Sequence, residues 1–574
     1  MVILGLSSSG YNTASVLLVD GNVIHAVEEE RLVREKRTRR FPIAGIRAAL
    51  DHAGLEFDDI DVVAVGWNPA INLEALSVAQ SQRHRYLGEL LYSVPNHLMS
   101  MKANNHAALS RQQIDFLDGS STEIVFVTHH ASHAASFFFS AFDEAAILTA
   151  DAFGEKQSAT FSYGKDHTIE TLWDQEFPHA LGSFYACFTE YCGFKPQSDE
   201  WKLMGASPFG DPTRFKDKLR TLIDFKDDGG FDLDLRYFNH FQFHRPLLHT
   251  SKMRQLLGIP PNARDKPLAQ DYYDLAAAAQ AVFEDIYMHL LRALHHRTGQ
   301  RRVVIAGGTA LNSVANGKVL TETPFEDMFV PPVPDDSGCS IGAALYVHHQ
   351  LNGARRSYVM RDNYLGPGWS NEEIEAELVR CKIGYEILSD PPRTAAELIA
   401  EGNIIGWLQG RLEFGDRALG NRSILADPRD EAMKDRVNAM VKYREPFRPF
   451  APSILAERVD EFFVDAVPTP FMEKVFQIRL DKRSVIPAVT HVDGSGRLQT
   501  VTAEQNPLYH RLIRAFDDLT GVPIVLNTSF NLKGEAMVCS PRDALRTFYS
   551  SGLDALIMGN NLVYKQTATG GPAR

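Results

Sequence analysis

The chain has 574 residues, which exceeds the size of one hydrophobic core and predicts two or more domains. Apolar residues make up 44% and charged residues 23%, as in soluble globular enzymes. The net charge of −13 argues against general affinity for nucleic acid or anionic membranes, so an anionic substrate would need a local basic pocket.

The five cysteines are widely spread and form no CxxC pair, which argues against a disulfide framework and against a thiolate metal site. The first residues, MVILGLSSSG, lead straight into a strand and lack the features of a signal peptide. No segment has the apolar length of a membrane span. We therefore expect a cytoplasmic protein.

The N-terminal region predicts strands at residues 2–6, 14–19 and 22–28, with Asp20-Gly21 as a hairpin turn. The Ser/Gly turn after the first strand can present backbone N–H groups to a phosphate, although such turns are common without ligands. A helix at 42–53 and a strand at 62–66 follow. Residues 68–119 show no clear strand pattern and are interpreted as a helical insertion.

Two histidines and an aspartate follow within residues 125–155. His129 and His133 are four residues apart, so on a helix they share a face, and the apolar strand AAILTAD ends on Asp151. Two imidazoles and one carboxylate can hold a divalent metal and leave positions open for a phosphate ligand. The alternative is that the histidines cap a helix or fill a partly buried face.

Glycines and a further carboxylate mark the next candidate positions. A strand at 303–306 runs into Gly307-Gly308 and a helix, a pattern by which a backbone approaches a nucleotide, although many α/β proteins use it for packing alone. Asp336 at the start of the helix 339–348 is a candidate further metal ligand. Gly182 begins a helix, and Lys202 lies in a tight turn.

A polar stretch at 353–363 suggests a domain boundary, giving domains at 1–353 and 364–565 and a flexible tail at 566–574. The second domain carries dense basic segments at 410–423 and 442–452. Arg448, among prolines and aromatic residues, predicts a partly buried guanidinium that needs an anion, which could be a phosphate. Structural pairing with Glu413 or Asp416 is the alternative.

The first domain holds two similar layouts, a strand, turn and hairpin near residue 2 and another near residue 146. Such a duplication is what an actin-like nucleotide-binding fold requires, with one phosphate loop in each half. The predicted fold class is therefore α/β.

The chain resembles the NodU/CmcH-type carbamoyltransferases, which carbamoylate aminoglycosides, cephems, ansamycins and nodulation factors. The most specific matches are GDRALGNRSILADPR and LNTSFN. The other matches, in family order over nearly the whole chain, are VDGNVIHAVEEERL, HHASHAASFFFSAF, KLMGAS, GGTALN, DDSGCSIGAAL, FRPFAPSIL and GRLQTV.

The resemblance implies an actin-like domain, similar to enzymes that transfer threonylcarbamoyl groups, followed by a YrdC-like α/β domain. By analogy, the second domain releases phosphate from carbamoyl phosphate, and the first activates the resulting carbamate with ATP as carbamoyl-adenylate. An acceptor hydroxyl then takes the carbamoyl group and AMP leaves. Carbamate decomposes in water, so a closed space suits this chemistry.

The resemblance also implies site residues. The metal ligands match His129, His133, Asp151 and Asp336, with iron(II) suggested by the family and Mn, Zn or Mg as alternatives. The ATP and carbamoyl-adenylate surroundings match Lys36, Asp151, Gly154, Gly182, Lys202, Gly307, Gly308 and Asn312. The carbamoyl phosphate pocket matches Arg417, Lys442, Arg448, Arg497, Asn527 and Ser529.

Three positions depart from the family pattern. The histidine expected as base for the acceptor hydroxyl is replaced by Tyr11, with Asn12 beside it, and tyrosine titrates near ~10. Ala152 stands where the family often has Gly, and Arg37 where it often has His. His130 is then the candidate base, because histidine titrates near ~6.5.

We therefore predict carbamoyl transfer from carbamoyl phosphate to a hydroxyl of a small natural product, as in antibiotic biosynthesis. The alternatives are N-carbamoylation of an amine and a nucleotide-binding regulatory relative that has lost transfer. We expect a small-molecule acceptor as partner, no nucleic acid and no membrane, and allow for a homodimer.

Overall fold

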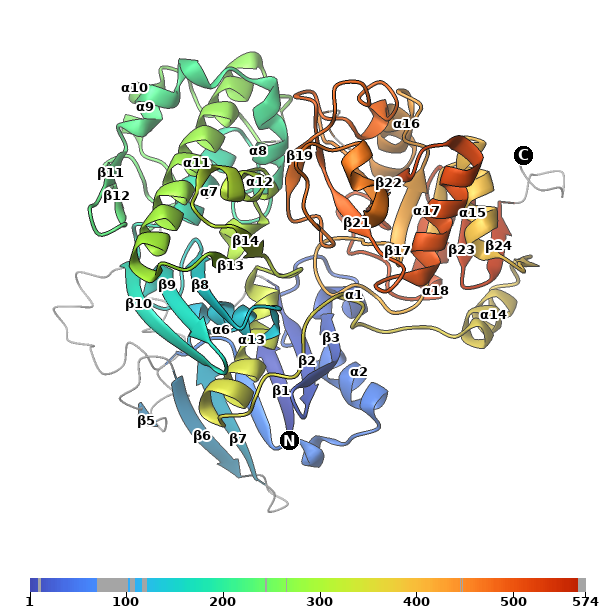
Figure 1. Cartoon of the computed structure of the whole chain (residues 1–574), viewed down its shortest axis with the longest axis horizontal. Coiled ribbons are helices and arrows are strands. Elements are labelled where there is room, and N and C mark those ends of the chain that lie inside the picture. The colour runs from blue at the N-terminus through green and yellow to red at the C-terminus, as the bar shows by residue number, and fades with distance from the viewer. Residues whose placement is uncertain are drawn as a thin grey trace. The chain divides into compact units, whose positions relative to one another are not determined.

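The structure is a computed structural model that describes residues 1–8, 12–69, 102–103, 109–115, 121–242, 245–264, 266–443, 445 and 447–565. Its contacts divide the chain into two compact units (Figure 1). Unit 1 comprises Met1–Ile24 and Arg39–Met360, and unit 2 comprises His25–Thr38 and Arg361–Arg574. The short segment His25–Thr38 thus packs with the C-terminal half of the chain. The domain boundaries predicted from the sequence placed this segment in the first domain.

The first sheet of unit 1 has the strand order β3-β2-β1-β4-β7-β6-β5. β1 pairs antiparallel with β2 and parallel with β4, and β4 pairs parallel with β7. The strands are β1 (Val2–Ser7), β2 (Ala14–Val19), β3 (Asn22–Glu28), β4 (Val62–Val65), β5 (Lys102–Ala103), β6 (Leu109–Asp115) and β7 (Ser121–Val127). β5 and β6 contradict the predicted absence of strands at 68–119; most of that stretch lies outside the described residues. β6 escaped prediction because its alternation of apolar and polar residues is weak.

The second sheet of unit 1 has the order β10-β9-β8-β13-β14. β8 pairs antiparallel with β9 and parallel with β13, so the sheet repeats the layout of β3, β2, β1, β4 and β7. This duplicated order confirms the predicted actin-like fold. The strands are β8 (Glu144–Ala150), β9 (Gln157–Lys165), β10 (Thr168–Glu176), β13 (Arg302–Ala306) and β14 (Asp327–Phe329).

Small residues let helix α13 (Cys339–Leu345) lie against both β1 and α6 (His129–Ala134). A Cβ at Gly342 would stand 1.8 Å from the Ser132 carbonyl oxygen, and a Cβ at Gly5 would stand 2.1 Å from that of Ser340. Glycine at position 342 therefore lets α13 approach α6 closely, and glycine at position 5 lets β1 approach α13 closely.

The other helices of unit 1 include the long, largely buried α11 (Gln270–Thr298), which ends at Gly299. The helix predicted at 339–348 is α-helical only to Leu345, and the chain continues from Tyr346 as a π-helix. The remaining helices and short strands are α2 (Ile43–Ala53), α7 (Leu181–Tyr191), α8 (Glu200–Ala206), α9 (Lys216–Arg220), α10 (Ser251–Leu257), α12 (Ser313–Glu322), β11 (Ile223–Phe225) and β12 (Phe231–Leu233).

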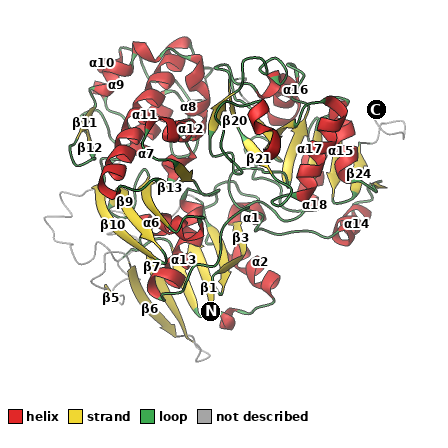
Figure 2. Cartoon of the chain, in the orientation of Figure 1, coloured by secondary structure: helices red, strands yellow, loops and turns green. Residues whose placement is uncertain are grey.

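Unit 2 is built on an eight-stranded mixed sheet with the order β15-β24-β23-β16-β17-β22-β18-β21, flanked by helices (Figure 2). Its strands are β15 (Glu386–Ile387), β16 (Ile405–Leu408), β17 (Arg422–Ala426), β18 (Ala451–Leu455), β21 (Gln499–Val501), β22 (Ile524–Ser529), β23 (Ala555–Met558) and β24 (Asn561–Tyr564). A separate pair is β19 (Val475–Gln477) and β20 (Ser495–Arg497). The helices are α1 (Glu29–Val33), α14 (Asn371–Arg380), α15 (Pro391–Ala400), α16 (Met433–Val437), α17 (Pro507–Thr520) and α18 (Pro541–Tyr549).

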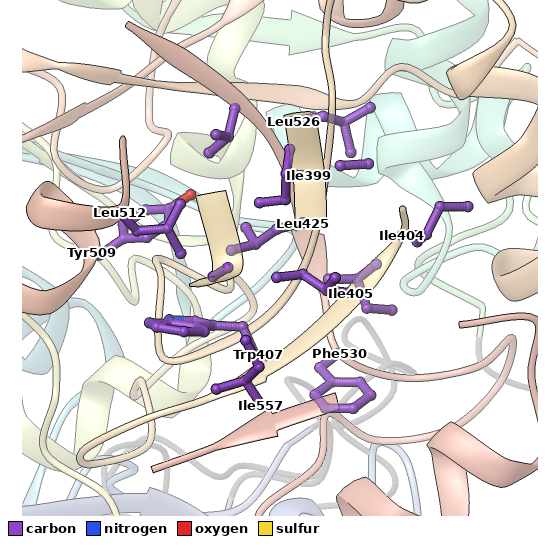
Figure 3. Close-up of a cluster of buried hydrophobic side chains, with 14 of the residues drawn as sticks. Ile399, Ile404, Ile405, Trp407, Leu425, Tyr509, Leu512, Leu526, Phe530 and Ile557 are labelled. Atoms are coloured by element: carbon purple, nitrogen blue, oxygen red, sulfur yellow. The ribbon is translucent and has the colours of Figure 1, made fainter. Parts of the chain in front are cut away.

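The core of unit 2 is formed between this sheet and its helices (Figure 3). Trp407 on β16 is fully buried, and its indole N–H donates to the Gly420 carbonyl at 2.9 Å. Ile399 of α15 and Leu512 of α17 pack in the same cluster as Leu425 of β17. The core thereby fixes the loop before β17, which carries the GDRALGN motif.

In the part of the chain that the structure describes, every helix is too short or too polar to cross a membrane.

Candidate functional site

The two histidines of α6 meet two aspartates from other elements of unit 1. His133 Nε2 lies 3.1 Å from Asp151 Oδ2, and His129 Nε2 lies 3.4 Å from the same oxygen. His129 Nε2 also lies 3.7 Å from Asp336 Oδ1, and the two Nε2 atoms are 3.1 Å apart. All four predicted metal ligands are therefore brought together.

Strand ends explain this convergence. α6 begins directly after β7, Asp151 directly follows β8, and Asp336 starts the short turn that leads into α13. His129 and His133 project from one face of α6 because they are one helical turn apart.

The donor set fits a divalent cation. Metal–N and metal–O bonds of about 2.1 Å place neighbouring donors about 3.0–3.4 Å apart in octahedral or tetrahedral geometry, and the donor distances here run from 3.1 to 3.7 Å. Burial disfavours charge on His133, yet nearby Cys339 and Asp151 raise its pKa to about 10. Burial favours the neutral form of Asp151, but hydrogen bonds from His129 and His133 hold its pKa below the usual range. The acidic groups around the two histidines thus favour positive charge at this position.

Asp151 is held by backbone groups on both sides. Gly308 N–H donates to its Oδ2 at 2.9 Å, and Ala152 N–H donates to its Oδ1 at 3.2 Å. A Cβ on Gly182 would stand 2.5 Å from the Ala152 nitrogen, and a Cβ on Gly307, whose φ is +92°, would stand 2.2 Å from the Ala150 carbonyl oxygen. The glycines predicted to face a nucleotide therefore also shape the loop that carries Asp151.

Glu155 is a residue of this region that the sequence reasoning missed. Its carboxylate accepts hydrogen bonds from the backbone N–H groups of His129 at 3.0 Å and Asn68 at 2.6 Å. It thus caps the start of α6, and burial raises its pKa. Its position four residues after Asp151 was the only available signal.

Three predicted nucleotide residues have structural contacts of their own. Lys202 Nζ donates to Asp199 Oδ2 at 2.9 Å. Asn312 exchanges side-chain amide hydrogen bonds with Gln280 of α11 at 3.0 and 3.1 Å. A Cβ on Gly154 would meet the His130 ring at 2.9 Å. Lys36 belongs to unit 2, where its neighbours include Glu30 and Asp416.

The candidate base, His130, is enclosed. Its Nδ1 lies 2.7 Å from Thr149 Oγ1 and its Nε2 lies 3.1 Å from the Gln157 carbonyl oxygen. Burial and the neighbouring His129 lower its pKa to about 3, so the ring is neutral at neutral pH. Asn12 is also buried, and Tyr11 lies outside the described residues.

In unit 2, sheet topology gathers the predicted carbamoyl phosphate residues at one edge. β22 runs antiparallel to β17 and β18, and β18 is parallel to β21. The starts of β17, β18 and β21 and the end of β22 therefore share an edge. The residues at or just outside these strand ends are Arg417, Arg448, Arg497, Asn527 and Ser529.

Lys442 joins this edge through the loop after β22. Its buried Nζ donates to the Ser529 carbonyl, to Asn531 Oδ1 at 2.8 Å and to the Asn531 carbonyl at 3.1 Å. Asn531 also accepts from Ser529 Oγ at 2.8 Å. This network holds one cation beside the predicted pocket.

Asn527 lies deeper in the same edge. Its amide Nδ2 is 3.1 Å from Gln499 Oε1, 3.2 Å from Ser453 Oγ and 3.1 Å from the Ala418 carbonyl oxygen. Arg448 Nη1 lies 3.4 Å from Glu445 Oε2. Glu413 accepts from the backbone N–H groups of Leu419 and Asn421, each at 2.8 Å.

Comparison with known proteins gives the class. A sequence profile described as Carbamoyltransferase N-terminus matches residues 2–345, and one described as Carbamoyltransferase C-terminus matches residues 396–565. These matches, with the fold and the two gathered sets of residues, define an enzyme that transfers carbamoyl groups. The chain belongs to the carbamoyltransferase family, as its motifs predicted.

Several relatives match along most of this chain. Nodulation protein NolNO of Sinorhizobium fredii is 39% identical over 97% of this chain and 80% of its own length. Nodulation protein NolO of Bradyrhizobium diazoefficiens is 40% identical over 77% of this chain and 80% of its own. An uncharacterized protein of Synechocystis is 38% identical over 98% of this chain and 96% of its own.

Solved structures match more distantly. The activator of the 2-hydroxyisocaproyl-CoA dehydratase from Clostridium difficile, with bound ADPNP, aligns with 62% of this chain and 96% of its own at 14% identity and a TM-score of 0.30. HypF of T. kodakarensis aligns with 62% of this chain and 48% of its own at 13% identity and a TM-score of 0.31. The assignment of an actin-like fold depends on the duplicated strand order, and these alignments add nothing to it.

Proposed function

We propose that this carbamoyltransferase uses ATP to move a carbamoyl group from carbamoyl phosphate, through carbamoyl-adenylate, to a hydroxyl of a small natural product. The observation that carries the proposal is the division of chemistry between the units. Unit 1 gathers a cation-binding donor set beside glycine loops, and unit 2 gathers arginines, a lysine and amides at one sheet edge.

Unit 2 suits the carbamoyl phosphate step. Arg417, Arg448 and Arg497 offer guanidinium groups, which pair bidentately with phosphate oxygens. Lys442, held by Ser529 and Asn531, adds a fixed point charge. In this step the bond between the carbamoyl carbon and the phosphate oxygen breaks, water supplies the new oxygen, and phosphate and carbamate are released.

Unit 1 suits the activation step. A carbamate oxygen attacks the α-phosphorus of ATP, the bond between the α- and β-phosphates breaks, and pyrophosphate leaves. His129, His133, Asp151 and Asp336 would hold a divalent cation, and when bound it supplies positive charge for the nucleotide phosphates. We favour iron(II), with Mn, Zn or Mg as alternatives. The Gly307-Gly308 turn presents backbone beside the same carboxylate.

In the transfer step the acceptor hydroxyl attacks the carbamoyl carbon, its proton goes to a base, and AMP leaves. The enclosed His130 ring does not favour the prediction that this histidine is the base. An acidic hydroxyl or an amine acceptor would remove the need for one. Two of the relatives carry the name nodulation protein, and the family that the motifs resemble includes enzymes that carbamoylate nodulation factors.

The proposal is tested by incubating the protein with ATP, a divalent metal, carbamoyl phosphate and candidate acceptors, and detecting the carbamoylated product by mass spectrometry. We expect AMP and pyrophosphate in amounts equal to the product. Binding of ATP without any pyrophosphate, with every acceptor and metal tried, would instead identify a regulatory relative that has lost transfer.

A further inference from the structure

A fifth donor stands beside the histidines. Cys339, the first residue of α13, is fully buried, and its Sγ lies 3.5 Å from His133 Nε2 and 3.6 Å from His129 Nδ1. The carboxylates approach the other nitrogen of His129, its Nε2. The sulfur, His129 Nδ1 and His133 Nε2 therefore form a second set of possible ligand atoms. This set shares only His133 Nε2 with the set that contains the carboxylates.

The distances from the Cys339 sulfur to the two histidine nitrogens equal those between neighbouring ligand atoms of one metal ion. In a tetrahedral zinc site, Zn–N bonds of about 2.1 Å and a Zn–S bond of about 2.3 Å place nitrogen and sulfur about 3.6 Å apart. Both sulfur–nitrogen distances agree with this value. One ligand atom from each of His129, His133 and Cys339 lies within 4.8 Å of the other two, so the three residues form a group that could hold a metal ion.

Hydrogen bonds alone account poorly for this crowding. His133 Nε2 carries at most one hydrogen, yet it faces Asp151 Oδ2 at 3.1 Å, His129 Nε2 at 3.1 Å and Cys339 Sγ at 3.5 Å. A single N–H can be directed at only one of them. A cation can be shared by several donors at once, and soft thiolate with imidazole is a donor set that zinc prefers.

We propose that Cys339 gives the site a second coordination mode, in which His129 Nδ1, His133 Nε2 and the Cys339 thiolate bind a thiophilic ion such as Zn²⁺. The inference rests on the proposed function in treating His129 and His133 as metal ligands. The thiol proton is released to solvent when the ion binds. Because both modes require His133 Nε2, an ion held in the thiolate mode excludes an ion from the carboxylate mode and thereby inhibits activation by ATP.

X-ray absorption at the zinc edge tests this mode on the full chain with one equivalent of Zn²⁺. We expect a sulfur neighbour at about 2.3 Å in the wild type. The sulfur signal should be lost in Cys339→Ser and kept in Asp151→Asn, which removes a carboxylate charge from the other mode. Cys381→Ser, which removes an exposed thiol elsewhere, is the matched control and should keep the signal.

Only nitrogen and oxygen neighbours around zinc in the wild type would overturn the proposal, and so would a sulfur signal that survives in Cys339→Ser. Cys339→Ala replaces the serine variant if a hydroxyl at this buried position unfolds the protein. Pyrophosphate formation is measured in parallel with Mg²⁺. If pyrophosphate forms but zinc has no sulfur neighbour, only the thiolate mode is refuted. If zinc has a sulfur neighbour but no pyrophosphate forms, only the proposed function is refuted.

Discussion

His133 Nε2 and Asp151 Oδ2 lie 3.1 Å apart, although one residue is on α6 and the other follows β8. This contact joins the end of the first half of the duplicated fold to the first strand of the second. In the actin-like arrangement, a ligand held by both residues would be in contact with both halves. The contact is therefore the basis on which we propose that the activation chemistry takes place in unit 1.

His133→Ala removes the nitrogen that Asp151, His129 and Cys339 all face. We expect loss of bound metal and of carbamoyl-adenylate formation, with the fold retained, because the other donors remain but no longer surround an ion. Metal analysis and pyrophosphate release measure the two effects. His296→Ala, an exposed histidine on α11, is the control, and full metal occupancy in His133→Ala would refute the ligand assignment.

The two half-reactions should separate by variant. Asp151→Ala should stop pyrophosphate formation and leave phosphate release from carbamoyl phosphate largely intact, because Asp151 belongs to unit 1. Arg448→Ala should abolish phosphate release while ATP still binds. If both variants lose the same step to the same degree, the division of chemistry between the units is wrong.

Lys442→Ala should impair unit 2 in both stability and activity. The oxygens of the half-buried Ser529 and Asn531 would lose the charged Lys442 donor, at a cost of about 1–3 kcal/mol. Thermal unfolding and phosphate release are the measurements. Lys533→Ala, which changes an exposed lysine two residues beyond Asn531, is the control and should change neither.

Gly182→Ala tests the loop that carries Asp151. The added Cβ would stand 2.5 Å from the Ala152 nitrogen and 2.7 Å from the Asp151 carbonyl carbon, so backbone must shift. We expect a loss of about 1–3 kcal/mol in the free energy of unfolding and weaker metal binding. Unchanged metal affinity in a folded variant would show that the loop position does not control the site.

His130→Ala examines the candidate base. A base role predicts intact carbamoyl-adenylate formation with transfer slowed by at least ~100-fold. The contacts with Thr149 and Gln157 predict instead that the variant loses stability and slows both steps together. Tyr11→Phe, measured alongside, should have a much smaller effect on transfer. If Tyr11→Phe abolishes transfer and His130→Ala does not, the phenol is part of the acceptor site.

The metal ligands could be predicted from the sequence because local periodicity and strand ends fix their positions. A spacing of four places His129 and His133 on one face of a helix, and Asp151 ends an apolar strand. Cys339 could not be predicted, because its histidine partners are 206 and 210 residues away and no CxxC spacing marks it.

The basic segment at 410–423 shows a second limit of prediction from the sequence. Arg422 is fully buried and donates to the backbone carbonyls of Gln409 and Asn421, so it holds the loop and is unavailable to a ligand. The sequence pattern alone does not distinguish it from Arg417 or Arg448. The packing of His25–Thr38 with unit 2 could not be predicted from the sequence either. It depends on contacts such as that of Arg31 with the Gly415 carbonyl, 384 residues away.

The central claim is that unit 1 uses ATP to activate carbamate made from carbamoyl phosphate. The most direct measurement is mass spectrometry of the wild type with ATP, carbamoyl phosphate and a divalent metal in the absence of acceptor. The account predicts carbamoyl-adenylate and pyrophosphate that both require carbamoyl phosphate, whereas phosphate release continues without ATP. Release of phosphate with no adenylate and no pyrophosphate, under each of the metals named above, would contradict it.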